Sequence, residues 1–501
     1  MKIAGLDIGT TGCKLTVFDQ AGAYRDHAYR DYPVKRSSLG HEVDAEAIME
    51  NVLAVMKEMG EKYPDIAGIG VTSFGETFVM ADEEGTPLHL AMLYTDPRGR
   101  EECLELEEKL GGMRIASVTG LRPHEMYSIP KIMWMKKNRP EIYRQAAHIF
   151  LMEDYVVFRL TGKVQIDYSL AARTMAFDIT ALKWSGEIFE EAGIDMELMS
   201  APVPAGTAAG SLRREIAQKT GLKEQVQIIS VSHDQVAAAV GAGVFDSDTA
   251  VDGAGTVECL TPVFAGLPDS WVMYEGYYSV VPYVVPGKYV CYAFSYTGGA
   301  LIQWCTDTLA KKEREFAKEQ GISVNTYLEN QFRAAGAKPN APTGILVLPH
   351  FAGAATPYMD TGSKGAVIGL RMETTVADIY CACMEGVVYE MLWNMECLKG
   401  SGIHFKMLHA TGGGAKSEFW MQMKADMLNV PVTALKTADA GTVGSAMLTG
   451  IAVGCFDSLE DAAAHMVEKQ RVYHPRQEMY EKYQEVYQRY RRLYQAVRPL
   501  V

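Results

Sequence analysis

Residues 405–420 read FKMLHATGGGAKSEFW. The stretch Phe405 to Ala410 is short and apolar, which predicts a buried strand, and Thr411 to Ala415 is a glycine-rich turn. From Lys416 onward the apolar residues recur at helical spacing. Bare glycine backbone lets a flat ring lie against it, and the following helix offers free N–H groups to an anion. A tight strand-to-helix turn without any ligand explains this pattern equally well.

A second turn of related type stands near the start of the chain. Residues 3–12 read IAGLDIGTTG, an apolar strand that ends in Asp7 and a turn that carries the hydroxyls of Thr10 and Thr11. A second strand follows and predicts a hairpin whose loop presents N–H groups, hydroxyls and Lys14 to a phosphate. Asp7 suits a hydrated Mg²⁺, which takes oxygen ligands and keeps several waters. An ordinary hairpin with a capping aspartate is the alternative.

A third segment repeats this pattern in the middle of the chain. Residues 249–256 read TAVDGAGT, which is again a strand, an aspartate (Asp252) and a turn formed by Gly255 and Thr256. Asp7 and Asp252 lie almost half a chain apart, a spacing much longer than that of solenoid repeats. We expect an internal duplication in which two related domains each offer a phosphate loop to a shared nucleotide cleft.

Composition limits the classes of partner. The chain has 501 residues, 48% of them hydrophobic and 22% charged, which predicts two to four globular domains with ample core. The net charge of −14 argues against nucleic acid or an acidic membrane surface as the main partner. An anionic nucleotide must therefore be bound by local donors and positive charges, namely loop N–H groups, a lysine and Mg²⁺.

The sequence also predicts a cytoplasmic protein. We find no N-terminal signal, because the chain enters a strand at once and Asp7 interrupts the apolar run, and no apolar stretch approaches the ~20 residues that span a bilayer. The nine cysteines are scattered and include no Cys-x-x-Cys pair. Free thiols in a reducing compartment are therefore expected.

The best candidate for a domain boundary is the segment 245–248, FDSD, between a small-residue helix and the second aspartate strand. Two helical stretches, 459–470 and 477–493, close the chain, and the second is expected to pack outside the second domain. We therefore expect an α/β protein with three units, which are residues 1–245, 246–455 and 456–501.

Asp234 is the most interesting carboxylate. It follows a buried strand and opens a helix rich in alanine and glycine, where a carboxylate can accept a proton from a hydroxyl. Gln235 beside it can both donate and accept hydrogen bonds, as recognition of a polyol requires. A simple helix cap is the alternative role for Asp234, and the two roles are compatible.

Two more carboxylates stand in turns at strand ends. Residues 73–77, SFGET, place Glu76 between two apolar strands, and residues 94–98, YTDPR, end another strand with Asp96. Either carboxylate can bind sugar hydroxyls, and a solvated turn is the alternative for each. The chain has no Gly-x4-Gly-Lys-[Ser/Thr] loop, zinc spacing, hydrolase elbow or protein-kinase motif set.

In this order the loops resemble those of the FGGY family of carbohydrate kinases, from about residue 2 to 455. One family signature matches residues 126–138, MYSIPKIMWMKKN, throughout. A second spans residues 365–385, where Cys383 departs from the small or aliphatic residue expected. Two such long signatures are far more specific than any glycine turn.

The resemblance implies an actin-like (ribonuclease H-like) duplicated fold with an interdomain cleft, and MgATP-dependent transfer of a γ-phosphoryl group to a sugar hydroxyl. Asp234 matches the family's general base, and Asp7 matches the residue that holds Mg²⁺ through water. A side chain at Gly414 is expected to enter the adenosine space. The residues that match the ATP site are Thr10, Thr11, Lys14, Gly255, Thr256, Gly299, Gln303, Gly413, Gly414 and Ala415.

The match to the family is weaker at the candidate sugar-binding residues, which are Glu76, Asp96 and Gln235. The Phe-Gly before Glu76 and the Ser-His before Asp234 resemble rhamnulose and fuculose kinases, but Gln235 replaces their usual threonine. The substrate therefore stays open between a ketose, such as a pentulose or 6-deoxyhexulose, and a related polyol. A non-catalytic, nucleotide-dependent regulatory protein on the same fold is the rival reading, and Asp234 in a full loop set favours the enzyme. A homodimer is compatible with the sequence, which does not decide the oligomeric state.

Overall fold

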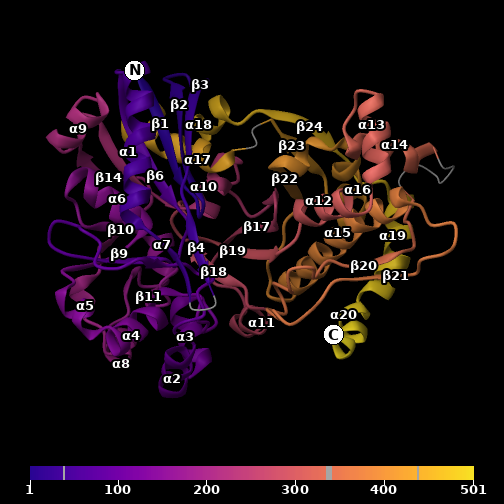
Figure 1. Ribbon diagram of the computed structural model, residues 1–501, viewed down its shortest axis with the longest axis horizontal. Coiled ribbons are helices and arrows are strands. Elements are labelled where there is room, and N and C mark those ends of the chain that lie inside the picture. The colour runs from indigo at the N-terminus through magenta and orange to yellow at the C-terminus, as the bar shows by residue number, and fades with distance from the viewer. Residues whose placement is uncertain (38–39, 335–340, 437–438) are drawn as a thin grey trace.

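The computed structural model describes residues 1–37, 40–334, 341–436 and 439–501. The two halves of the chain form two lobes, each built on a central sheet (Figure 1). The six strands of the N-terminal lobe, in their order across the sheet, are β14 (Thr207–Ser211), β15 (Gln227–His233), β6 (Ile66–Ser73), β1 (Lys2–Ile8), β2 (Gly12–Asp19) and β3 (Tyr24–Asp31).

The C-terminal lobe holds a seven-stranded sheet. Its strands in spatial order are β18 (Ser279–Pro282), β19 (Lys288–Ser295), β17 (Glu258–Ala265), β16 (Thr249–Ala254), β22 (Met407–Thr411), β23 (Val432–Leu435) and β24 (Lys469–Tyr473). The strand predicted at 405–410 is thus β22, an inner strand between β16 and β23, and the glycine turn follows it.

The two sheets repeat one topology. In the N-terminal sheet β1 pairs antiparallel with β2, which pairs antiparallel with β3, while β1–β6 and β6–β15 are parallel. In the C-terminal sheet β16, β17, β19, β22 and β23 take the same places with the same strand directions. This correspondence confirms the predicted duplicated α/β fold.

Two helices cross between the lobes. Helix α10 (Asp234–Gly241) follows β15, and helix α17 (Ala440–Ala452) follows β23, so they are equivalent elements of the duplication. A Cβ at Gly241 would lie 1.9 Å from the Ala440 carbonyl oxygen, and one at Gly444 would lie 1.9 Å from the Ala237 carbonyl oxygen. The two backbones therefore touch directly, which only glycine permits.

Helix α17 also packs on the sheet of the opposite lobe. It contacts β1 and β6, and in Figure 1 it lies beside the N-terminal strands although it comes late in the chain. A Cβ at Gly5 would lie 2.2 Å from the Thr442 carbonyl oxygen, so this contact is again backbone on backbone. The chain thus returns to its first lobe before it ends.

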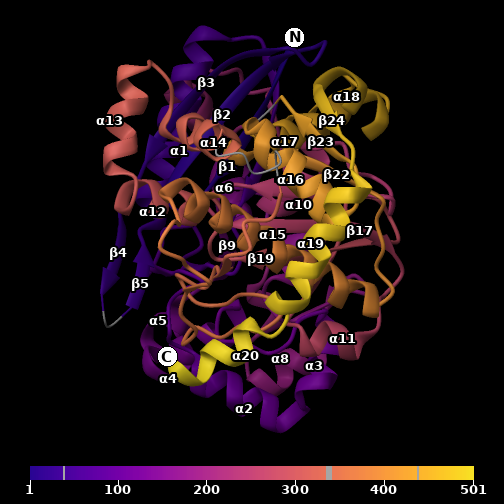
Figure 2. The same cartoon turned by 90° about the vertical axis from the view of Figure 1, so that its right-hand side faces the viewer.

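The remaining helices cover the sheets and extend the base of the N-terminal lobe (Figures 1 and 2). Those of the N-terminal lobe are α1 (Ala45–Lys62), α2 (Arg100–Leu110), α3 (Gly112–Thr119), α4 (Ser128–Asn138), α5 (Pro140–Gln145), α6 (Met152–Thr161), α7 (Tyr168–Ala172), α8 (Gly186–Ala192) and α9 (Arg214–Thr220). Those of the C-terminal lobe are α11 (Ser270–Glu275), α12 (Gly299–Thr308), α13 (Lys311–Glu319), α14 (Val324–Ala334), α15 (Val376–Gly400) and α16 (Glu418–Leu428).

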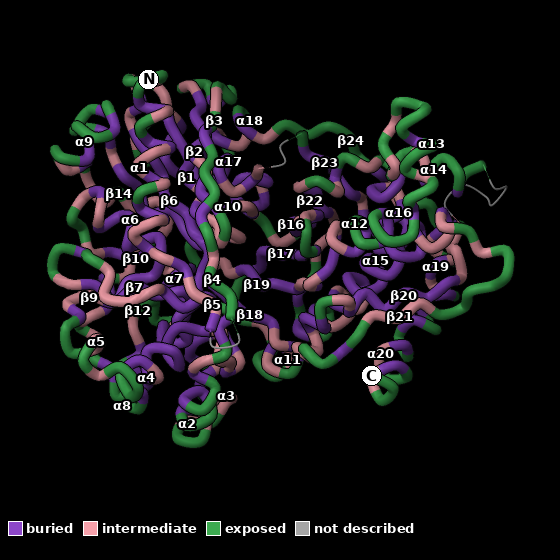
Figure 3. Tube along the Cα trace, viewed as in Figure 1, coloured by how far each residue is buried: buried purple, intermediate pink, exposed green. Residues whose placement is uncertain are grey.

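Residues buried from solvent follow the two sheets and the helices between them (Figure 3). One hydrophobic cluster runs without interruption from Val231 on β15 through α10 into the C-terminal sheet. The lobes therefore share a core. All nine cysteines are free thiols, seven of them buried. Along the described ranges, no helix is both long and apolar enough to cross a bilayer.

The C-terminal segment differs from the expected pair of helices. Helix α18 (Leu459–Met466) ends early, and residues 469–473 instead form β24, which pairs antiparallel with β23. The backbone groups along the outer side of β23 need partners, and β24 supplies them. Two further helices, α19 (Gln477–Tyr490) and α20 (Leu493–Val497), follow; α18 packs on α17, whereas α19 packs on α16 of the C-terminal lobe.

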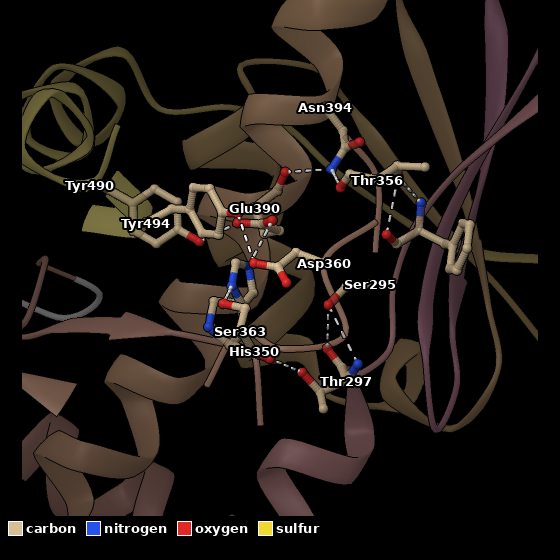
Figure 4. Close-up of polar contacts among 12 residues, drawn as sticks. Ser295, Thr297, His350, Thr356, Asp360, Ser363, Glu390, Asn394, Tyr490 and Tyr494 are labelled. Atoms are coloured by element: carbon tan, nitrogen blue, oxygen red, sulfur yellow. Dashed lines mark hydrogen bonds and ion pairs between the residues drawn. The ribbon is translucent and has the colours of Figure 1, made fainter. Parts of the chain in front are cut away.

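A buried polar network ties α19 to the long helix α15 (Figure 4). The Tyr490 hydroxyl donates to the Glu390 carboxylate, whose Oε1 lies 3.2 Å from His350 Nε2. His350 Nδ1 in turn lies 2.8 Å from the Ser363 hydroxyl. The order Ser-His-Glu looks like a hydrolytic triad, but the Ser363 side chain is 0% exposed, so no substrate reaches it. This network is structural.

Candidate active site

The first phosphate loop lies between the two lobes. Its backbone closes through a 2.9 Å hydrogen bond from the Gly9 N–H to the Gly12 carbonyl, and Thr10 and Thr11 occupy the turn. Lys14 on β2 places its Nζ 2.5 Å from Asp439 Oδ2, and Asp439 is the N-cap residue of α17. The predicted loop residues therefore face the N-terminus of a helix that comes from the other half of the chain.

Asp7 stands at the end of β1 behind this loop. Its Oδ1 is buried and accepts no hydrogen bond from the described residues. Burial raises the pKa of Asp7 to about 8, and the nearby carboxylates of Asp234 and Asp439 act in the same direction. Only Lys14 opposes them. A carboxylate with an orphaned oxygen among like charges is a site that a cation would stabilise.

The protein supplies only part of a metal shell there. Among the residues that the structure describes, no group of three or more histidine, cysteine or acidic side chains could hold a metal ion. A cation beside Asp7 would therefore take most of its ligands from water or from a phosphate. Mg²⁺ is held in this way, by one or two carboxylates, waters and substrate phosphates. The donor set fits that ion.

Asp234 is the first residue of α10, with His233 in the N-cap position. It is therefore not the N-cap residue, and its side chain is 30% exposed. Burial raises the pKa of Asp234 to about 7, and the negative charge of Glu76 adds to this, while hydrogen bonds from Gln235 oppose it. A reachable carboxylate that titrates near neutral pH is matched to general base catalysis.

His233 fixes one side of Asp234. Its Nε2 lies 3.3 Å from Asp234 Oδ1, and its Nδ1 lies 3.0 Å from the Tyr292 hydroxyl on β19 of the other lobe. Burial, with the charge of Arg173 added, holds the pKa of His233 well below its usual range, so the ring is neutral. A neutral imidazole carries one N–H donor. The His233 Nε2–H can therefore donate to Asp234, while Nδ1 accepts from the Tyr292 hydroxyl.

Glu76 is not a solvated turn residue, because its side chain is only 6% exposed. Its backbone has φ 63°, an uncommon conformation for a residue other than glycine. Arg173 Nε donates to Glu76 Oε1 at 2.6 Å, and the Ser128 hydroxyl donates to the Glu76 carbonyl at 2.7 Å. The structure thus brings Glu76 next to Asp234 and pairs it with a buried arginine.

Asp96 is also buried, but its oxygens already have partners. Oδ2 accepts the His41 N–H at 2.7 Å and Arg98 Nη2 at 2.6 Å, while Oδ1 accepts Arg98 Nε at 2.8 Å. Burial alone would raise the pKa of Asp96, but these bonds lower it. The solvated-turn reading is wrong here too. Asp96 orders its loop, and its part in sugar binding stays a prediction.

The other predicted ATP-binding residues surround one large cavity of about 1140 Å³ in the C-terminal lobe. Backbone hydrogen bonds join two of its loops, because the Gly299 N–H donates to the Gly255 carbonyl at 2.8 Å. Ala415 is buried beneath the third loop. The predicted residues that line the cavity are Gly255, Thr256, Gly299, Gln303, Gly413 and Gly414.

The two central glycines of the third loop differ in what surrounds them. A Cβ at Gly413 would meet nothing within 4 Å, so this residue opens toward the cavity. A Cβ at Gly414 would lie 2.8 Å from Trp420 Cζ3 and 2.9 Å from the Ala254 Cβ. The expectation that a side chain at Gly414 enters the adenosine space is therefore wrong, since packed protein lies there. Gly413 is the position from which a side chain would enter.

Sequence reasoning missed the residues that surround Glu76. Arg173 places its guanidinium 5.2 Å from the centre of the Tyr127 ring and 5.5 Å from that of Tyr292. One signal was available, because Arg173 interrupts the run LAARTMAF, and an arginine among apolar residues needs a buried partner.

Comparison with known proteins gives a family. The model of the N-terminal domain of the FGGY family of carbohydrate kinases matches residues 2–241, and that of the C-terminal domain matches residues 267–453. The chain is 26% identical over 479 residues to a xylulose kinase of Bacillus subtilis, covering 95% of this chain and 93% of the relative. It is 29% identical over 488 residues to a glycerol kinase of Halorhodospira halophila, covering 94% and 92%.

Solved structures agree on the fold. A xylulose kinase from Lactobacillus acidophilus superposes with a TM-score of 0.87 at 23% identity, covering 99% of this chain and 98% of that one. A gluconate kinase from the same organism gives 0.88 at 22% identity, with the same coverage. The two matched domains occur in the order of the two lobes and their loops, and the protein belongs to the FGGY family of carbohydrate kinases.

Proposed function

We propose that this carbohydrate kinase uses Asp234 as the general base that prepares a sugar hydroxyl for attack on the γ-phosphorus of ATP. One observation carries the proposal. Strands β1 and β15 both pair with β6, and Ile8 and His233 both lie opposite Ser73. Asp7 and Asp234 therefore stand on either side of one strand end, where their charges interact.

The chain's own residues divide the work. Asp234 accepts the hydroxyl proton while the hydroxyl oxygen bonds to the γ-phosphorus and the bond from that phosphorus to ADP breaks, and His233 holds the carboxylate in place. Lys14 and the N–H groups of the first loop face the transferred phosphoryl group, and the cavity beside Gly413 takes the adenosine. Phosphoryl transfer needs mainly this positioning and charge neutralisation.

Mg²⁺ beside Asp7, held largely through water, would neutralise charge on the phosphates of ATP. Glu76 and Gln235 flank Asp234 and would contact other hydroxyls of a ketose or polyol. We take residues 1–245 and 246–455 as the two domains, with 456–501 as a C-terminal extension.

The substitution Asp234→Asn tests the assignment. It preserves the shape of the side chain but removes its basicity, so we expect a loss of about 10²–10⁴-fold in kcat. The affinity for ATP, measured by calorimetry, should not change. Asp248→Asn is the matched control, because Asp248 is 63% exposed and lies outside the site.

Release of ADP with and without a panel of sugars separates the enzyme from the rival reading. A kinase releases ADP in proportion to added sugar. ATP hydrolysis that ignores the sugar, or no turnover with any sugar, would support a regulatory protein on the same fold. A kcat of Asp234→Asn close to that of the wild type would refute the assignment of Asp234 as the general base.

A further inference from the structure

A small cavity of about 50 Å³ lies between the lobes, apart from the ATP cavity. Arg173 and Tyr127 line it from the N-terminal lobe, and Ser279 and Tyr292 line it from the C-terminal lobe. This space has room for a few waters or for a group of carboxylate size.

Arg173 offers this cavity an unused donor. Its side chain is 5% exposed, and its Nε binds Glu76, but its buried Nη1 has no acceptor among the described residues. Buried guanidinium nitrogens are normally hydrogen-bonded, because an unmade bond leaves the cost of desolvation uncompensated. The atom that is missing here is an oxygen acceptor.

A second guanidinium lines the same cavity. The Arg122 Cζ lies over two aromatic rings, 4.0 Å from the centre of Tyr277 and 4.5 Å from that of Tyr274, and its Nη1 donates to the Tyr274 carbonyl at 3.3 Å. No carboxylate in the described ranges forms an ion pair with it. Arg122 is therefore held in place without a counter-charge.

The rest of the lining is neutral. Tyr127 Oη and Ser279 Oγ lie 3.1 Å apart, and either hydroxyl can turn to donate into the cavity. No acidic side chain is among the described residues that line it. Glu76 pairs with Arg173, whose charge also interacts with Asp234, so the positive charge without a carboxylate partner among the described residues is that of Arg122. Hydroxyls of a neutral sugar would not balance it, whereas a carboxylate would.

The wall of this cavity leads directly to the general base. Tyr292 lines the cavity, and its hydroxyl lies 3.0 Å from His233, which contacts Asp234 at 3.3 Å. Glu76, the partner of Arg173, also interacts with Asp234 through its charge. The cavity is therefore separated from Asp234 by one pair of side chains, Tyr292 and His233, and Arg173 links it to Asp234 through Glu76.

We infer that the substrate is a sugar acid, an aldonate whose carboxylate binds Arg173 Nη1 and Arg122 while a distant hydroxyl meets Asp234. This inference rests on the proposed function, since it names the substrate class of the same site. It accounts for the unused donor of Arg173 and the unpaired charge of Arg122 together.

Matched substrates test the inference. ADP release is measured with D-gluconate against D-glucitol and D-fructose, and with D-xylonate against xylitol and D-xylulose, so that each set keeps its carbon number and changes the acid group. We expect kcat/KM for at least one acid to exceed that of its neutral partners by about 100-fold or more. Turnover with a neutral sugar but with neither acid would overturn the inference and leave the proposed function intact. No turnover with any of them would count against both.

Two variants test the arginines. Arg122→Gln keeps the ion pair of Arg173 with Glu76, so the protein should fold, and we expect at least a tenfold rise in KM for the acid with little change in kcat. Arg173→Lys keeps a positive charge but loses the guanidinium group that can contact two oxygens at once, so it should also raise the KM for the acid. Arg114→Gln is the matched control, because Arg114 is 56% exposed on α3.

Binding without turnover gives an independent readout. The acid that is turned over should raise the Tm of the wild-type protein in the absence of ATP, and this shift should vanish in Arg122→Gln. Acetate and inorganic phosphate serve as free anions. If either one raises the Tm as much as the acid and activates turnover of a neutral sugar, the cavity binds a separate anion and the inference is wrong.

Discussion

The first hairpins of the two lobes have one topology but treat their aspartates differently. In the N-terminal lobe Asp7 keeps a buried oxygen without a donor among the described residues. In the C-terminal lobe Asp252 accepts from Lys424 Nζ at 2.6 Å, and Lys424 also binds Glu258. Lys424 is 2% exposed and comes from α16, whose Trp420 lines the ATP cavity.

The difference shows how one duplicated part serves two purposes. The Lys424 ammonium group satisfies the carboxylate of the C-terminal lobe, and the same bond holds α16, which helps to line the large cavity, against the sheet. The Asp7 carboxylate of the N-terminal lobe keeps a buried oxygen without a donor among the described residues, and the proposed function assigns that oxygen to a cation from solution. Under that proposal, one hairpin supports the ATP cavity and the other holds the metal beside the reacting groups.

The largest effect should come from breaking the buried ion pair of Lys424 with Asp252. Lys424→Met would leave Asp252 and Glu258 facing each other in the core, and removal of one partner of a buried ion pair costs about 3–5 kcal/mol. Urea unfolding measures this loss. Lys436→Met is the control, because Lys436 pairs with Glu468 at 2.6 Å but is 63% exposed, and exposed pairs contribute about 0–1 kcal/mol. Equal losses in the two variants would contradict the structural role of Lys424.

The second-largest effect concerns the carboxylate of Asp7. The folded protein binds the Asp7 proton more tightly than the unfolded chain does, because the pKa rises from 3.8 to about 8. Without metal, stability is therefore expected to fall as the pH rises from about 4 to about 8. Mg²⁺ added with ADP should raise the Tm at pH 8 and have little effect at pH 5. A ligand at 100 times its Kd stabilises by about 2.7 kcal/mol.

Paired variants decide whether this response belongs to one hairpin. Asp7→Asn should abolish the Mg²⁺ shift and raise the Tm of the metal-free protein at pH 8, because a repelled charge is removed. Asp252→Asn should keep the Mg²⁺ shift. If both variants lose the shift, or neither does, the two aspartates are not divided between a cation and a lysine as described.

The smallest effect separates the two glycines of the third loop. Gly413→Val places a side chain in open space within the ATP cavity, so we expect a rise in the KM for ATP of about tenfold, or ~1.4 kcal/mol, with the Tm unchanged. Gly414→Ala meets Trp420 and Ala254 instead, and overpacking costs about 1–3 kcal/mol of stability. The outcome that would contradict this is the reverse, a lower Tm in Gly413→Val and a weaker ATP affinity alone in Gly414→Ala.

Sequence patterns predicted the parts of this fold that local chemistry determines. Strands ending in Asp7 and Asp252, each followed by a small-residue turn, indicated the duplication, because both strand ends carry the same residue types. The sequence could not show that these aspartates differ. Lys424 lies 172 residues from Asp252, and nothing local connects them.

The substrate side was less predictable for the same reason. The turn at 73–77 drew attention to Glu76, whose part in sugar binding stays a prediction, but its partner Arg173 lies 97 residues away on another element. The solvated-turn alternative for Glu76 and Asp96 failed because burial depends on what the rest of the chain places over a turn. The predicted helix 459–470 overran the first two residues of β24, Lys469 and Gln470, because their conformation is set by the free edge of β23 and not by a local strand pattern.

The direct backbone contact of α17 with β1 means that the boundary visible in the sequence is not a boundary in space. A fragment that stops near residue 245 would leave the face around Gly5 bare, since the helix that covers it is made about two hundred residues later. The first lobe cannot complete its core during synthesis until nearly the whole chain has emerged. The two lobes repeat one topology, but their packed faces are completed only by the whole chain.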